Sequence, residues 1–402
     1  MQAWLERVGR LMPFGKTASA GTKMAGTPLV ALEGLSAPSW TTRDFAAYAR
    51  EGMMRNPVVY RCVRMISEAA ASVPIEVKDR SANVIAGHPV ADLMASPSSR
   101  GRSGAAFLEA CFGTLLVSGN LYLEAAGVGG EIGELHHLRP DRVRVLADAD
   151  GWPQGFEYAV GHDRRVIAGE VVPGVERVLH LRLFHPIDDH YGLSPIEAAA
   201  TAVDIHNAAS RWNKALLDNA ARPSGALVYT TGGHMTADQF GRLKNELEEN
   251  FQGARNAGRP LLLEGGLDWK AMSLSPRDMD FIEAKHAAAR DIALALGVPP
   301  MLLGIPGDNT YANLQEANRM FWRQAVLPLV YRTTTALARW LSPAWPDEPF
   351  MLVPDIEGIE ALRSEREALW RRLDAASFLT GDEKRQAVGY PPLTGDDQSR
   401  PA

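Results

Sequence analysis

The chain has 402 residues, a hydrophobic fraction of 46%, a charged fraction of 22% and a formal net charge of -6. This composition is typical of a globular protein with two or three packed units, and it excludes disorder throughout. The acidic balance is a poor match for a protein that holds DNA through many Lys and Arg contacts to phosphate.

The amino-terminal region predicts a flexible arm. Residues 1–16 form a short basic amphipathic segment that lacks the continuous apolar stretch and cleavage site of a secretory signal. Residues 17–40 are rich in Ala, Gly, Ser, Thr and Pro and show no periodicity. We therefore expect residues 1–40 to be an arm that precedes the folded part.

The first folded segment is predicted to be helical. Thr41, with Asp44 three residues later, is a helix-start pattern. The segment from residue 56 to 75 places apolar side chains at helical spacing before Pro74 ends it. Cys62 lies in this segment and Cys111 in a later apolar stretch, which predicts two buried core residues rather than a disulfide or a zinc site.

Helix and strand patterns then alternate. A second apolar helix is expected over residues 107–117, followed by a strand over 120–126 and a glycine-rich turn over 127–130. Further short strands follow up to Phe184. This order predicts a mixed α/β unit.

Two long helices with a small insertion between them come next. Ser194 and Glu197 form a capping-box pattern with proline between them, which starts a helix of about 26 residues, some 39 Å long. A strand over 222–231, a helix over 236–251 and strands over 260–264 and 267–273 predict a small β-α-β unit.

The second long helix follows this insertion. Ser275 and Pro276 repeat the cap-plus-proline pattern and start a helix over 277–296 that contains six alanines. The two long helices therefore form a stalk whose tip is the β-α-β unit. Enzyme folds rarely need such a stalk, whereas a ring can line a tunnel by repeating the helix pair around its axis.

The carboxyl-terminal part begins with a polar loop from Gly304 to Tyr311. A helix over 312–341 contains Pro328, which should kink it. An apolar strand over 351–353, a charged helix over 360–376 and a short final helix capped at Thr380 complete the chain.

Catalytic motifs do not match. The glycine cluster at residues 127–133 has Ile132 where a dinucleotide-binding loop needs its third glycine, so a hairpin turn is favoured. The chain has no Walker A phosphate loop. Gly192 and Ser194 resemble the start of the G-x-S-x-G motif that carries the catalytic serine of hydrolases. However, Pro195 removes a backbone donor and Ile196 replaces the second glycine, so Ser194 is interpreted as a helix cap. We expect no enzymatic activity and no cofactor.

Metal-site and basic-cluster patterns are also weak. A loop with a few polar residues is a more common explanation than a ligand set for four neighbouring side chains, namely His185, Asp188, Asp189 and His190. His136 and His137 are adjacent and would face opposite sides of a strand. A modest basic group is interpreted as a solvated face, and its members are Arg102, Arg139, Arg142 and Arg144. We predict no metal site.

Several separated blocks resemble the portal protein family of long-tailed phages, of the Hong Kong 97 type. The blocks are NPVVYRCVRMISEAAASVP at 56–74, GNLYLE at 119–124, LRPDRV at 138–143, YGLSPIEAA at 191–199, NAARPSGAL at 219–227, GRPLLLEGGLDWKAMSLSPRDMDFIE at 258–283 and ALGVPPMLLG at 295–304. The resemblance covers roughly residues 41 to 395.

The resemblance implies an α+β portal fold that assembles as a ring. Its parts would be an α/β wing, a two-helix stem, a small α/β clip, a kinked long helix and a short helical crown. The implied bounds are 1–40 for the arm, 41–193 for the wing, 194–221 for stem helix 1, 222–275 for the clip, 276–298 for stem helix 2, 299–312 for the tunnel loop, 313–345 for the kinked wing/crown helix and 346–402 for the C-terminal wing strand and crown.

The resemblance also implies a function and partners. The chain would be one subunit of a ring of about twelve copies at a capsid vertex, through which double-stranded DNA is packaged and ejected. The terminase large subunit, the head-tail adaptor and the major capsid protein would bind it. It would reside in the virion after assembly in the bacterial cytoplasm, with no membrane association. The DNA-facing residues would be those of the tunnel loop, namely Gly304, Ile305, Pro306, Gly307, Asp308, Asn309, Thr310 and Tyr311.

Two other classes of function stay open at this point. A packaging nuclease or ATPase would need a phosphate loop or a convergent carboxylate set. A monomeric adaptor that conducts nothing would show no ring.

The acidic balance generates a prediction for the loop. If Asp308 lies beside the DNA, Asp308→Lys adds a phosphate contact that holds the duplex. We expect slower packaging or less retained DNA, with ring formation intact. Packaging assays on purified particles measure this, and unchanged packaging would contradict the loop assignment.

Overall fold

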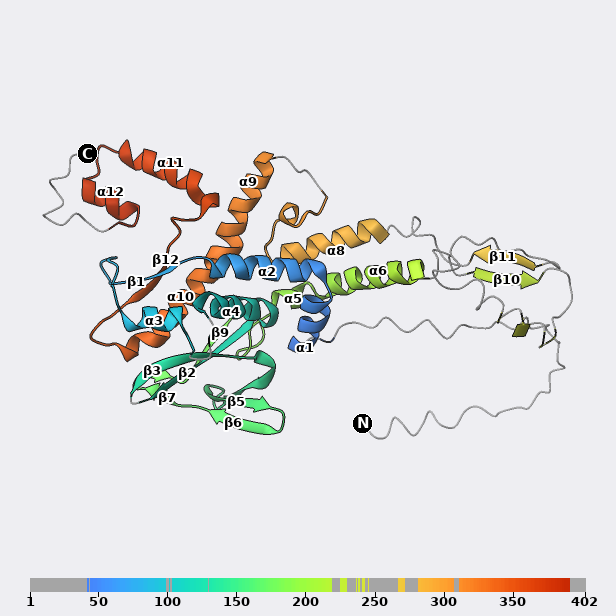
Figure 1. Ribbon diagram of the computed structural model, residues 1–402, viewed down its shortest axis with the longest axis horizontal. Helices are drawn as coiled ribbons and strands as arrows, with labels where there is room; N and C mark the ends of the chain where they lie inside the picture. The colour runs from blue at the N-terminus through green and yellow to red at the C-terminus, as the bar shows by residue number, and fades with distance from the viewer. Residues whose placement is uncertain are drawn as a thin grey trace, which may run out of the picture. The chain divides into compact units, whose positions relative to one another are not determined.

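The computed structural model describes most of the unit Trp40–Ala402, and all residues treated below belong to that unit (Figure 1). The described residues are 42, 44–98, 101, 103–128, 130–218, 225–229, 236, 238, 241–242, 245, 267–271, 281–306 and 311–390. The predicted arm, most of the clip and the start of stem helix 2 lie outside them.

The main core forms around two helices whose ends follow from local chemistry. Helix α2 (Pro57–Ala71) begins after Asn56, whose side chain accepts hydrogen bonds from two backbone N–H groups of the first turn. Helix α4 (Gly104–Ser118) ends at Gly119, which has the left-handed φ of 74°. The two helices lie side by side and bury Cys62 and Cys111. Both side chains are buried, so the predicted core role of the two cysteines is confirmed. Burial also raises the pKa of Cys62 to about 12.

The remaining helical segments surround this pair. They are α1 (Phe45–Ala47), η1 (Tyr48–Met54), α3 (Pro89–Ala95), η2 (Pro140–Arg142), α5 (Pro195–Ala198), α6 (Ala200–Asp218), α8 (Phe281–Ala295), η4 (Pro300–Leu303), α9 (Tyr311–Met320), η5 (Phe321–Val326), α10 (Leu327–Leu341), η6 (Ser342–Ala344), η7 (Glu360–Leu362), α11 (Arg363–Asp374) and α12 (Gly381–Ala387). Among them η1 and η5 are π-helical.

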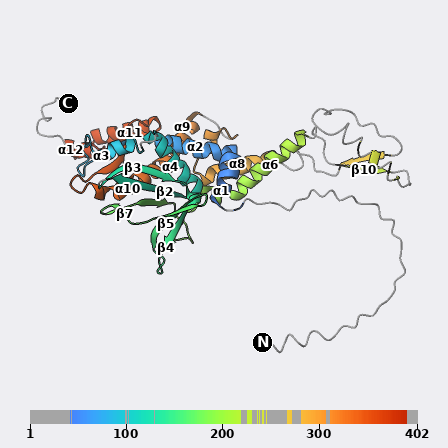
Figure 2. The ribbon, with the colours of Figure 1, turned by 60° about the horizontal axis from the view of Figure 1, so that its bottom comes forward.

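Two three-stranded antiparallel sheets form the β part of the predicted wing. One has the order β3-β2-β9, from Glu131–Leu138, Asn120–Val128 and Val178–Arg182, and the other has the order β4-β5-β6, from Val143–Ala147, Pro153–Val160 and Asp163–Ile167. Helix α4 contacts β2 and β3 of the first sheet (Figure 2). The glycine cluster is the hairpin between β2 and β3, as predicted.

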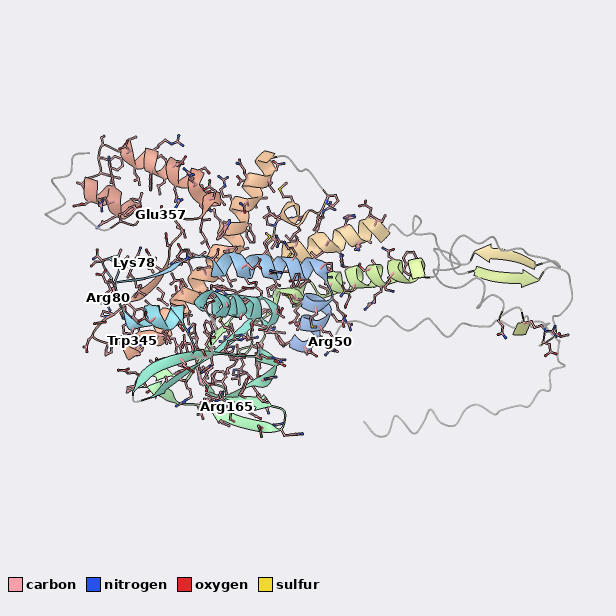
Figure 3. The ribbon with its side chains drawn as sticks, in the orientation of Figure 1. Arg50, Lys78, Arg80, Arg165, Trp345 and Glu357 are labelled. Carbon is pink, nitrogen blue, oxygen red and sulfur yellow. The ribbon has the colours of Figure 1, made fainter. Side chains whose placement is uncertain are left out.

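The two sheets share a small core of their own. Its buried residues are Tyr122, Leu138, Val143, Phe156, Ile167 and Val178. His180 stacks on Tyr122 at 4.2 Å between ring centroids, and burial lowers its pKa to about 4. Arg165 of β6, labelled in Figure 3, forms a two-point ion pair with Glu124 of β2, with distances of 3.0 and 2.6 Å. This ion pair bridges the two sheets at the edge of their shared core.

Distant segments of the chain also pair. Strand β12 (Met351–Pro354), the predicted carboxyl-terminal strand, is antiparallel to β1 (Ile75–Lys78), which directly follows α2. Strands β7 (Glu170–Val172) and β8 (Val175–Glu176) form a small hairpin, and β10 (Gly225–Tyr229) pairs with β11 (Leu267–Ala271) in the predicted clip.

The predicted helix over 194–219 is interrupted, so one continuous helix was wrong. Ala199 separates α5 from α6, with φ -93° and ψ 4°, outside the α-helical region. The Ser194 hydroxyl caps α5 by accepting from the Ile196 N–H, and it also donates to the Val117 carbonyl at 2.7 Å. This tertiary bond fixes the first turn to the end of α4, and the helix restarts after it.

Other predicted helix ends are confirmed or shifted. Thr380 and Glu383 form a capping box at α12. The first helix begins at Phe45 with Asp44 as its cap, rather than at Thr41, which lies outside the described residues. No helix among the described residues is both long enough and apolar enough to span a membrane.

The close approach at Gly119 generates a stability prediction. A Cβ here would lie 2.5 Å from the Leu193 carbonyl carbon and 2.6 Å from the Gly192 oxygen, at a positive φ. We expect Gly119→Ala to lower the free energy of unfolding by about 3 kcal/mol or more. Denaturant unfolding measures it.

Gly130→Ala is the matched control for this prediction. Its φ is 91°, but nothing lies within 4 Å of the added Cβ, so only the backbone cost of about 1 kcal/mol applies. Equal losses in the two variants would contradict the steric explanation.

Candidate functional site

The two long helices of the predicted stem lie side by side in the structure. Helix α6 contacts α8, as Figure 1 also shows. The buried face of α8 is mostly small, with Ala288, Ala289 and Ala293 beside Ile292. Small side chains allow the backbones of neighbouring helices to approach closely. The predicted pairing of these two helices is therefore present.

A buried polar network joins α6 to the base of α2. Asn56 donates its side-chain amide to Asn207 Oδ1 at 3.0 Å and contacts His206 Nδ1 at 3.2 Å. Asn207 in turn donates to the Glu51 carbonyl at 2.8 Å. The three side chains are 1%, 3% and 7% exposed, so each needs these partners. We call these three residues, Asn56, His206 and Asn207, the stem-wing hub.

The second long helix also acts on this hub. Burial lowers the pKa of His206, and the nearby ammonium of Lys285 in α8 lowers it further. His206 is therefore neutral at neutral pH. Its Nδ1 can then accept the Asn56 amide hydrogen bond.

The end of α8 has the geometry of a Schellman motif. Gly297 has a φ of 71°, and its N–H donates to the Leu294 carbonyl at 3.0 Å. The Val298 N–H donates to the Ala293 carbonyl at 2.9 Å. The prolines that follow prevent the α-helix from continuing, and the short helix η4 forms instead.

The predicted loop starts from this motif and is attached to α8. Gly304 ends η4 with a left-handed φ of 71°, and Ile305 is buried. The Arg290 guanidinium donates to the Pro306 carbonyl at 2.6 Å. Gly307, Asp308, Asn309 and Thr310 lie outside the described residues, and Tyr311 is the first residue of α9. The near end of the loop is therefore fixed on the second long helix.

Pro328 lies in the first turn of α10, directly after a π-helical segment. Proline lacks a backbone N–H, and its ring crowds the carbonyl four residues earlier, which is Gln324 within η5. A π-helical turn is one way to absorb such an interruption. The kink at Pro328 itself stays a prediction.

An ion-pair cluster links this helix to the charged carboxyl-terminal helix. Glu365 of α11 accepts from Arg319 of α9 at 3.3 Å and from Arg323 of η5 at 3.2 Å. Arg319 also pairs with Glu316. Because these groups are partly exposed, their ion pairs add little to the free energy of unfolding. Their main effect is on the orientation of α11.

The other sequence candidates have local structural roles. Asp188 accepts from the backbone N–H groups of His190 and Tyr191, which closes a turn and lowers the pKa of its carboxyl. His136 pairs with Glu134 at 2.9 Å. No group of three potential metal ligands occurs among the residues that the structure describes.

Comparisons with known proteins agree with this architecture. The family model for phage portal proteins matches residues 57–389. The chain belongs to the phage portal protein family. A chain from the neck of an empty gene transfer agent particle is 51% identical, with a TM-score of 0.67 over 89% of this chain and 96% of that chain.

Two further relatives extend the likeness. The portal protein of Enterobacteria phage HK97 is 24% identical over 86% of this chain and 81% of its own length. An uncharacterised protein of Rickettsia bellii is 40% identical over 85% of this chain and 88% of its own length. The predicted family and α+β portal fold are confirmed, and the chain is a portal subunit of a tailed-phage-like particle.

Sequence reasoning missed the residues that hold the stem in place. The hub joins residues 150 positions apart, and Arg290 reaches Pro306 across 16 positions. No local motif identifies such pairs in a single sequence. His206 and Asn207 stand among other polar residues in the segment 200–218, so the local pattern does not single them out.

The loop attachment generates a prediction. Arg290→Met keeps an unbranched apolar stem but removes the guanidinium that donates to the Pro306 carbonyl. We expect hydrogen exchange at the Ile305 amide and its neighbours to accelerate at least about fivefold, because the loop loses a charge-assisted hydrogen bond. Asp291→Asn, on the adjacent exposed position, is the control and should change nothing. Equal exchange in both variants would contradict the attachment.

Proposed function

We propose that about twelve copies of this chain form the ring through which double-stranded DNA enters and leaves a capsid. The family membership supports it, as does a gene transfer agent neck determined with C12 symmetry, whose matching chain is 50% identical with a TM-score of 0.66. The identity to gene transfer agent chains is about twice that to the HK97 portal protein. A particle of that kind is therefore the favoured setting.

The paired helices α6 and α8 would line the channel, followed by the tunnel loop of residues 299–312. The hub supports this arrangement because it fixes α6 on α2 within a single subunit. The Arg290 bond supports it because it sets the position from which the loop leaves α8. In this proposal Arg290 is a positioning residue for the loop.

The negative net charge supports a channel that does not bind DNA tightly. Twelve chains with a net charge of -6 carry about -72 in total. Tight binding of phosphates needs the opposite sign. Double-stranded DNA would therefore slide past acidic and neutral polar groups, without specific contacts to the protein.

The partners and location follow from the same proposal. The clip would contact the terminase large subunit during packaging and the head-tail adaptor afterwards, while the wing would contact the major capsid protein. The ring would assemble in the bacterial cytoplasm and remain at one vertex of the virion. The chain would have no catalytic activity, since the energy for packaging would come from the terminase.

Images of the purified protein test the ring. We expect negative-stain class averages with rotational symmetry and a central hole, and native mass spectrometry should give a mass of about twelve chains. Monodisperse monomers at high concentration would contradict the proposal and favour a non-channel adaptor. ATP hydrolysis or DNA cleavage by the purified protein would favour the packaging enzyme instead.

A further inference from the structure

The His206 imidazole of the stem-wing hub has a protonation state that its neighbours dictate. The Asn56 side-chain oxygen accepts from the Val58 and Val59 N–H groups at 3.0 and 3.1 Å, which fixes the orientation of the Asn56 amide. The amide nitrogen of Asn56 therefore faces His206 Nδ1, at 3.2 Å. Because this nitrogen only donates, Nδ1 must carry no proton. The hub thus requires a neutral imidazole with its proton on Nε2.

The surroundings of His206 do not favour a positive charge. The side chain is 3% exposed. Among the described residues of η1, α5, α6 and α8, the other charged or histidine side chains that are at least partly buried are Glu51, Glu197, Asp204, Lys285 and His286. Of these, the ammonium of Lys285 acts on His206 as a like charge, and no described carboxylate pairs with the ring. An imidazolium here would be a buried cation without a counter-ion.

A proton on Nδ1 disturbs both helices that meet at the hub. It turns Nδ1 into a donor that faces the Asn56 amide, which is also a donor. Asn56 caps α2 and also donates to Asn207 of α6 at 3.0 Å, so its displacement loosens both helices at this point. Ala202 and Val203 hold the first turn of α6 in the main core, so the opening is local.

We propose that His206 is a proton-sensitive contact that releases α6 from the base of α2 when the pH falls below neutral. An amide side chain could supply the same acceptor without titrating, whereas a histidine couples the contact to pH. All the contacts that carry this inference lie within one chain, so it does not depend on the proposed ring.

The direction of the pH dependence follows from the two states of the hub. In the opened hub His206 has the ordinary histidine pKa of about 6.5. In the closed hub burial and the Lys285 ammonium lower this pKa. The contact is therefore complete above about pH 6.5 and weakens as the pH falls below that value. Within this window, each pH unit raises the ratio of open to closed hub by up to about tenfold.

Hydrogen exchange of the full chain measures the opening. Rates at about pH 7.5 and 5.5, corrected for the intrinsic pH dependence of exchange, are compared in peptides that cover residues 57–62 and 200–211. We expect opening in the wild type to rise about fivefold or more at the lower pH. In His206→Asn the side-chain oxygen takes the place of Nδ1 and does not titrate, so the rise should be absent. No rise in the wild type, or an equal rise in the variant, would overturn the proposal.

A charge placed opposite the ring gives a second measurement. Asn56→Asp keeps a good helix cap for α2 but sets a carboxylate beside Nδ1, which stabilises the imidazolium and raises the pKa of His206. The contact is then present at low pH and lost as the pH rises. We expect opening in this variant to fall between about pH 7.5 and 5.5. A rise like that of the wild type would count against the proposal, including in the case that His206→Asn does not fold.

His88 provides an internal control in the same samples. Its side chain is 1% exposed, and its Nδ1 accepts from the Val90 N–H at 3.1 Å at the start of α3. Neither substitution touches this site, so exchange at Val90 should have the same pH dependence in all three proteins. A change at Val90 that accompanies the change at the hub would indicate a global effect and overturn the local release of α6.

Discussion

The position of α6 on α2 depends on one buried amide. The Asn56 side-chain oxygen accepts from the first backbone N–H groups of α2, while its nitrogen donates toward His206 and Asn207 of α6. One residue therefore both starts α2 at the centre of the main core and positions α6. Because the site is fully buried, loss of any partner leaves a polar group without compensation, so the geometry has few alternatives.

Helix α8 is held by different means. It packs on α6 through alanines, ends in a Schellman motif at Gly297 and passes directly into a short helix that begins with proline. These features fix the direction of the backbone, and Ile292, Leu296 and Val298 anchor the same segment in the main core. The loop after Gly304 therefore leaves from a defined point, and Arg290 adds a further constraint at Pro306.

Helix geometry departs from the regular α form at Ala199, in η1 and in η5. The break at Ala199 separates the turn bound to α4 from the stem helix, and the π-helical segments η1 and η5 precede Asn56 and Pro328. Each irregularity lies close to a residue with a special bonding role. Ser194 donates to the Val117 carbonyl and Asn56 donates to Asn207 of α6, while Pro328 has no backbone N–H to donate. At Ala199 and η1 the irregular helix geometry accompanies a tertiary hydrogen bond, and at η5 it accompanies a proline.

The sequence alone determined the order of elements, the hairpin at the glycine cluster, the burial of Cys62 and Cys111 and the family, because these depend on local periodicity, turn chemistry and contiguous motifs. Tertiary structure alone decided the break at Ala199, the pairing of β1 with β12, the stem-wing hub and the attachment of Pro306 to Arg290. These join residues that lie close together only after folding, and no propensity or spacing within one segment records them. Asn56 shows both levels, since its capping role is local while its bonds to α6 exist only in the folded chain.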